Sequence, residues 1–114
     1  MNYEPQQKEI CSKYNVIYVA SNQNFKVGIS KTVLSGLMPI HGLRHLIEGD
    51  TTGWYIWSGE FRDDPDFFAP MHVSHLKNIC PCVLKYLGFP PGYRFLIDDK
   101  GYEDVWEDLS LLNM

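Results

Sequence analysis

Hydrophobic and polar positions alternate in short runs along the chain, with turn-forming residues between the runs. Alternation with a period of two predicts strands at residues 25–29 and 93–97. The sequence Asp-Asp-Lys-Gly at 98–101 is typical of a hairpin turn, so we expect residues 102–106 to return antiparallel to the strand before it. Large apolar residues flanked by glycines at 53–59 indicate a strand in the middle of the sheet, covered on both faces.

Weaker patterns predict short helices. A proline in its first turn favours a helix over residues 6–13, and Ser30 is expected to cap a short helix of residues 31–35. Apolar stripes with helical spacing run through residues 73–87, where Pro81 interrupts them. Because proline pushes the residue before it away from helical angles, we expect two short helices that meet at this position.

Two further strands complete the predicted order of elements. They are expected at residues 15–20, where β-branched and aromatic side chains are frequent, and at residues 38–46, where the pattern is weak. The succession predicts an α+β fold, with a mainly antiparallel sheet and short helices packed on it. A chain of 114 residues, 45% of them hydrophobic, is long enough for one buried core, so we expect residues 1–114 to form a single domain.

The charge, the apolar runs and the cysteine content narrow the possible partners and the cellular compartment. A net charge of −4 argues against a nucleic-acid binder, because phosphate neutralisation needs a surplus of lysine and arginine. No apolar run is long enough to cross a bilayer, and the first residues lack the features of a signal peptide, so no membrane partner and a cytoplasmic location are expected. Three cysteines form no disulfide framework and are expected to be reduced.

The acidic charge is concentrated in the second half of the chain. Residues 1–58 carry four acidic and five basic side chains, whereas residues 59–114 carry ten acidic and five basic ones. The acidic side chains form two clusters, at residues 60–66 and 98–108. If the clusters meet in the fold they make one acidic face, whereas separately they are an ordinary solvated surface.

Four residues supply the side-chain types of a zinc site or a thiol enzyme: His72, His75, Cys80 and Cys82. Their spacing differs from that of the usual zinc knuckles, and nothing marks an orienting carboxylate or an oxyanion hole. We therefore expect one buried thiol and surface histidines, with no catalytic residue, no metal and no cofactor. A small metal-binding or thiol enzyme, or a regulatory module that binds a ligand in a pocket lined by the tryptophans, stays open as an alternative.

Five motifs in chain order carry a resemblance to a known family. They are Ser30-Lys31-x-Val33-Leu34-x-Gly36, then residues 53–60 (Gly-Trp-Tyr-Ile-Trp-Ser-Gly-Glu), His72-Val73-x-x-Leu76, Leu87-Gly88-x-Pro90-Pro91-Gly92-x-x-Phe95, and residues 102–106 (Tyr-Glu-Asp-Val-Trp). In this order they resemble bacterial immunity protein family thirty-three and its close relatives, formerly a domain of unknown function. The resemblance covers the motif-bearing core, residues 25–108, and departs from the family pattern at His45 and Glu107.

The resemblance implies an immunity protein of a polymorphic toxin system, which acts in bacterial competition. Such a protein is cytoplasmic and protects the producing cell by binding and occluding a cognate toxin, without catalysis. An acidic surface suits a toxin with a basic surface, because opposite charges raise the association rate and buried aromatic side chains prolong the complex. The toxin-binding candidates are Asp63, Asp64, Asp66, Phe67, Phe68, Asp98, Asp99, Glu103 and Asp104.

Overall fold

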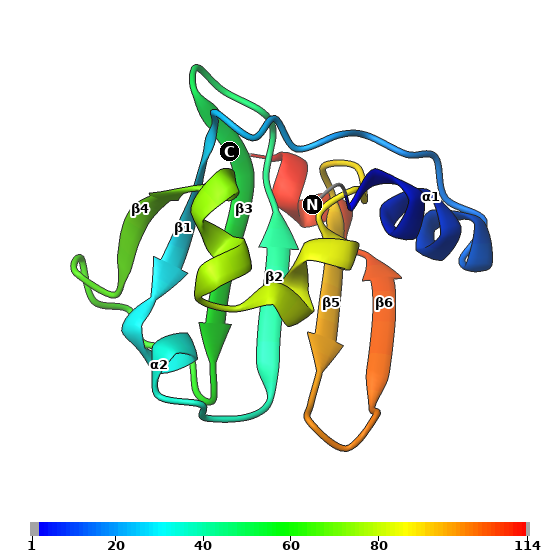
Figure 1. The fold of residues 1–114 in the computed structure, drawn as a ribbon. Coiled ribbons are helices and arrows are strands. Elements are labelled where there is room, and N and C mark those ends of the chain that lie inside the picture. Colours follow the sequence, from blue (N-terminus) through cyan, green and yellow to red (C-terminus); the bar gives the residue numbers. More distant parts are fainter. Residues whose placement is uncertain (1–2, 114) are drawn as a thin grey trace.

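One six-stranded sheet organises the protein, whose structure is a computed structural model that describes residues 3–113. The strand order is β4-β1-β3-β2-β5-β6 (Figure 1). All neighbouring strands are antiparallel except β1 and β3, which are parallel. The expected α+β class with a mainly antiparallel sheet is confirmed. The strands are β1 (Lys26–Ser30), β2 (Ile40–Arg44), β3 (Thr51–Ser58), β4 (Phe68–His72), β5 (Tyr93–Ile97) and β6 (Glu103–Glu107).

The helices of residues 4–13, 73–78 and 81–86 cover one face of this sheet, which we call the inner face (Figure 1). The α-helices are α1 (Glu4–Lys13) and α2 (Lys31–Leu34), and the 3-10 helices are η1 (Val73–Asn78), η2 (Pro81–Tyr86) and η3 (Leu109–Leu112). Figure 1 shows the two coils of residues 73–86 in front of the central strands and α1 beside the β6 edge. Buried side chains of both layers form the core, including Trp54, Ile56, Leu76, Val83, Leu87, Phe89 and Phe95.

Local sequence signals explain where several elements begin and end. The Ser30 hydroxyl accepts a hydrogen bond from the N–H of Thr32, as an N-cap does. A proline opens η2, and the two short helices expected on either side of it are present. In the β5–β6 turn, an Asp98 carboxylate oxygen accepts hydrogen bonds from the N–H groups of Lys100 and Tyr102. The predicted hairpin of residues 93–106 is therefore confirmed.

The structure lacks one predicted strand and has one strand that was not predicted. Residues 15–20 form no strand and instead cross from α1 towards β1 as an extended segment (Figure 1). Val16 and Tyr18 pack against the core, so their apolar character serves side-chain packing rather than sheet pairing. Residues 68–72, for which no strand was predicted, form edge strand β4 next to β1. An edge strand tolerates Pro70, because one side of its backbone has no partner strand.

A buried arginine, Arg44, holds residues 15–20, which we call the crossing segment, to the rest of the protein. The guanidinium of Arg44, in β2, is fully buried and donates hydrogen bonds to backbone carbonyls only. The acceptors are the oxygens of Thr52 at 2.8 Å, Val19 at 2.9 Å, Phe89 at 2.7 Å and Ala20 at 3.1 Å. Burial lowers the pKa of Arg44 to about 10, so the side chain stays charged at neutral pH.

Candidate functional site

The face of the sheet opposite α1, η1 and η2, which we call the outer face, carries a row of large side chains. The strand register places Tyr55, Leu43, Arg94 and Trp106 side by side on β3, β2, β5 and β6. Tyr55 and Trp106 remain 36% and 38% exposed. Trp106 does not pack in the core, because it lies on the outer face of β6, which is an edge strand.

A second row on the outer face ends in an aromatic cluster. The register places Trp57, His41, Leu96 and Asp104 side by side on the same four strands. The rings of Trp57 and His41 are stacked, with centroids 4.8 Å apart. Phe61 packs against Trp57 with ring centroids 5.5 Å apart, and stays 57% exposed. The outer face therefore presents aromatic surface at Tyr55 and Trp106 in the first row and at Phe61 beside the second row.

Phe67 and Phe68 take supporting positions in this cluster. Phe67 is buried and Phe68 half-buried, and their ring centroids lie 5.7 Å and 6.3 Å from that of Phe61. The sequence left two alternatives open for them, an exposed anchor on a protruding loop or a position that caps the core, and the burial of Phe67 agrees with the second. The exposed aromatic residue of the loop is instead Phe61, which was not among the toxin-binding candidates. Its position between Glu60 and Arg62, in a segment without periodicity, gave no signal that separates it from its neighbours.

The sheet register brings parts of the two acidic clusters to the same end of the molecule. Ser58 pairs with Ile40, Ile40 pairs with Ile97, and Ile97 pairs with Glu103. The loop of residues 59–67 follows β3 and the β5–β6 turn follows β5, so both leave the sheet at the same end. These two strands are two interstrand spacings apart, or about 10 Å. The acidic side chains carried there are those of Glu60, Asp63, Asp64, Asp66, Asp98 and Asp99. All except half-buried Asp98 are exposed.

The remaining acidic residues of the second cluster are distributed along β6 and do not form a single patch. Asp104 is exposed on the outer face. Asp108, at the opposite end of β6, forms an ion pair with Arg94 at 2.9 Å. The hydrogen bonds from Ser110 and this ion pair lower the pKa of Asp108. A continuous acidic face over residues 98–108 is therefore not formed.

Glu103 points to the inner side of the sheet, where it joins three elements. One carboxylate oxygen accepts hydrogen bonds from the Lys13 ammonium at 2.7 Å and the Tyr14 hydroxyl at 2.6 Å, and the other accepts from the Tyr86 hydroxyl at 2.6 Å. Burial raises the pKa of Glu103, but these donors outweigh that effect and bring it to about 2. The carboxylate is already engaged by its own chain, unlike the exposed aspartates.

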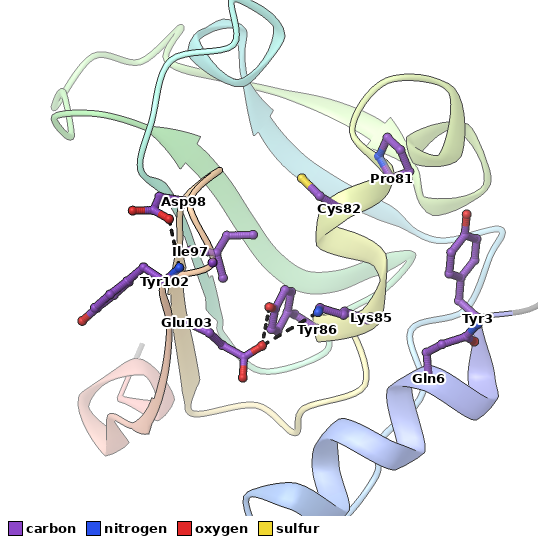
Figure 2. Close-up of a pocket in the computed structure, with 11 residues that line it drawn as sticks. Tyr3, Gln6, Pro81, Cys82, Lys85, Tyr86, Ile97, Asp98, Tyr102 and Glu103 are labelled. Atoms are coloured by element: carbon purple, nitrogen blue, oxygen red, sulfur yellow. Dashed lines mark hydrogen bonds and ion pairs between the residues drawn. The ribbon is translucent and has the colours of Figure 1, made fainter.

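A pocket of about 360 Å³ lies beside Glu103, between the beginning of α1, η2 and the β5–β6 turn (Figure 2). Its polar lining comes from Gln6, Lys85, Asp98 and Glu103, and the exposed Cys82 borders it. None of the three tryptophans lines this pocket, whereas Trp54 lines a smaller pocket of about 210 Å³ between β1, β3 and β4, so the ligand pocket considered as an alternative stays open.

The four metal-type ligands do not converge. His72 and His75 are both exposed, with ring centroids 5.6 Å apart, and the Cys80 and Cys82 sulfurs are 3.4 Å apart. Within residues 3–113, no three histidine, cysteine or acidic side chains lie close enough together to hold a metal ion. The expectation of a buried thiol at Cys80 with histidines on the surface is confirmed.

These features define a small α+β protein with an aromatic outer face, acidic loops at one end of the sheet and no assembled metal centre among the described residues. No helix in the described part of the chain is long and apolar enough to span a membrane. The family model of the Imm33-like domain matches residues 6–108. Because that match covers most of the chain, the protein belongs to the Imm33-like family, and the resemblance is confirmed. No curated protein and no solved structure matches the chain.

Proposed function

We propose that this protein is an immunity protein that binds a cognate bacterial toxin and neutralises it by occlusion, without catalysing a reaction. Membership of the Imm33-like family supports an immunity role. The observation that carries the binding mode is the outer face, where Tyr55, Phe61 and Trp106 are between 36% and 57% exposed. Large aromatic side chains are enriched in protein interfaces, where they bury much area at low entropic cost.

The charge distribution supports a toxin with a basic surface. Asp63, Asp66 and Asp99 are exposed at one end of the sheet, and Asp104 is exposed on the outer face itself. Acidic groups around an aromatic centre attract a basic partner during diffusion and exclude acidic ones. In this arrangement the aspartates set the association rate and the aromatic residues set the lifetime of the complex. Phe67 and Phe68 contribute by supporting Phe61.

The proposal is tested by co-expressing the protein with the toxin encoded beside it. We expect the natural chain to restore growth and to form a stable complex with the purified toxin. Replacing Phe61 and Trp106 by alanine together is expected to weaken binding by a factor of ten or more, because both rings lose their buried area in the complex. Affinity is measured by titration calorimetry and protection by colony counts.

A matched control is Ile17→Ser, which alters an exposed apolar residue on the segment that follows α1. This variant is expected to bind and protect like the natural chain. If the natural chain neither binds nor protects, the proposed function is wrong. If it protects and the double alanine variant binds equally well, the toxin occupies a different surface.

A further inference from the structure

The Cys-Pro-Cys segment at the start of η2 brings two thiols into contact. The sulfurs of Cys80 and Cys82 lie 3.4 Å apart. Cys80 is buried against the core, whereas Cys82 is exposed and borders the pocket beside Glu103. Pro81 opens η2 between them and restricts the backbone that holds the pair. The segment lies on the helical side of the sheet, away from the outer face proposed to bind toxin.

The surroundings of the two sulfurs favour different protonation states. The hydrogen bond from the Cys80 thiol lowers the pKa of Cys82, and the nearby Lys85 ammonium adds to this effect. The same interaction, together with burial, raises the pKa of Cys80. The exposed sulfur is thus the better nucleophile, since the thiolate is the reactive form of cysteine, while the buried sulfur keeps its proton.

We propose that Cys80 and Cys82 form a peroxide-reactive dithiol, in which Cys82 is oxidised first and Cys80 completes a reversible disulfide. In the first step the Cys82 thiolate attacks one oxygen of hydrogen peroxide, the O–O bond breaks, and hydroxide leaves. Cys82 becomes a sulfenic acid. In the second step the Cys80 sulfur attacks the Cys82 sulfur, the S–O bond breaks, and the departing hydroxide takes up the thiol proton to form water.

The overall reaction transfers two electrons from the two thiols to one peroxide molecule, yielding one disulfide and two molecules of water. The geometry suits this order of events. Peroxide reaches Cys82 from the pocket side, and Cys80 is already in contact behind it. Disulfide formation then requires the sulfurs to approach from 3.4 Å to about 2.05 Å.

Cys11 provides an internal comparison. It is buried, its thiol donates a hydrogen bond to the carbonyl of Gly88 at 3.4 Å, and burial raises its pKa. A buried, protonated thiol without a neighbouring sulfur is expected to resist peroxide. The reactivity therefore belongs to the Cys80–Cys82 pair and not to cysteine content as such.

The experiment treats the purified full chain with hydrogen peroxide and measures its mass under non-reducing conditions. Trypsin cleavage after Lys77 and Lys85 gives a peptide of residues 78–85 that contains both cysteines of the pair, while Cys11 falls in a different peptide. We expect the 78–85 peptide to lose about 2 Da, and dithiothreitol to restore the original mass.

Serine variants separate the two roles. Cys80→Ser is expected to stop at the sulfenic acid, a gain of about 16 Da that dimedone traps on Cys82. Cys82→Ser is expected to leave the peptide unmodified, and Cys11→Ser to behave like the natural chain.

Several results would overturn the proposal. They are a 78–85 peptide that keeps its reduced mass, one that gains oxygen without losing 2 Da, or a disulfide that includes Cys11. Because the peptide from the natural chain decides among these outcomes by itself, a variant that fails to fold does not remove the test.

Discussion

A single carboxylate, that of Glu103, joins α1 and η2 to the edge of the sheet. Lys13 and Tyr14 come from α1 and the residue after it, and Tyr86 comes from η2. Hydrogen bonds to an ionised acceptor are stronger than neutral ones, and the group is largely shielded from water by its donors. The cluster therefore links three elements through one negative charge.

This cluster predicts an acid-dependent loss of stability. The pKa of Glu103 is about 2 in the folded chain, against an ordinary value of 4.5. Since the folded-state value is the lower one, the ionised group stabilises the fold above about pH 4.5, and this contribution disappears as the pH falls from 4.5 towards 2. Glu103→Gln is expected to lower the free energy of unfolding at pH 7 by about 2 kcal/mol, after allowance for screening by solvent.

Urea unfolding at several pH values measures this effect. The difference between Glu103→Gln and the natural chain is expected to shrink between pH 4.5 and 2. Asp104→Asn is the matched control, because Asp104 is the next residue on the same strand but is exposed on the other face. Its effect is expected to stay within about 0.5 kcal/mol. An unchanged stability of Glu103→Gln at pH 7 would contradict the role assigned to this carboxylate.

Glu103 and Asp104 also show what the sequence could not reveal at this scale. Adjacent residues of a strand face opposite sides of a sheet, so one of the two had to be inward. Which one meets a cation depends on α1, whose Lys13 lies 90 positions earlier in the chain. Sequence pattern identifies an acidic cluster, but the contacts that neutralise some of its members are made across the fold.

At the level of elements, the loop of residues 59–67 combines acidic side chains with one exposed aromatic ring. Asp63 and Asp66 are exposed, whereas Asp64 also accepts a hydrogen bond from the N–H of Asp66 and shapes the loop. Changing both Asp63 and Asp66 to lysine leaves that hydrogen bond in place. We expect this variant to associate with the cognate toxin about ten-fold more slowly at low salt, with a weaker salt dependence.

The matched control reverses Glu9 and Glu48, two exposed acids outside the acidic loops. It changes the net charge equally, so it is expected to slow association less than the loop variant. Stopped-flow mixing at several salt concentrations measures both. Equal rates for the two variants would mean that net charge, rather than this loop, steers the encounter.

Elements with strong local signals were predictable from the sequence, and those defined by distant partners were not. The hairpin of residues 93–106 and the capped helix α2 have local turn and cap chemistry, and both are present. The strand β4 carries a proline and pairs only with β1, whose residues lie about forty positions earlier. Residues 15–20 have strand composition, but Arg44 binds two of their carbonyl groups, those of Val19 and Ala20.

At the level of the whole molecule, Arg44 joins segments that are remote in sequence. Its carbonyl partners belong to the crossing segment, to β3 and to the turn after η2. Replacing it with methionine leaves these acceptors without their donors in a buried site. Arg44→Met is therefore expected to lower the free energy of unfolding by about 2–5 kcal/mol, a large share of the stability of a small domain.

Urea unfolding compares this variant with Arg62→Met, which removes an arginine side chain that is 71% exposed. The control is expected to change stability by no more than about 0.5 kcal/mol. An Arg44→Met chain with the same unfolding midpoint as the natural protein would show that the carbonyl groups are satisfied in another way.

The long path from α1 to β1 has a consequence for how the chain folds during synthesis. The side chains of Gln7 and Cys11 in α1 donate hydrogen bonds to the backbone carbonyls of Leu84 and Gly88, each 77 positions later. Lys13 pairs with Glu103, 90 positions later. At a synthesis rate of about 5–20 residues per second, those partners emerge from the ribosome roughly 4–15 seconds after α1 does. The helix α1 is synthesised first but is thus among the last elements to pack against the rest of the fold. Under the proposed function, a newly made molecule can begin to protect the cell only once nearly the whole chain has been translated.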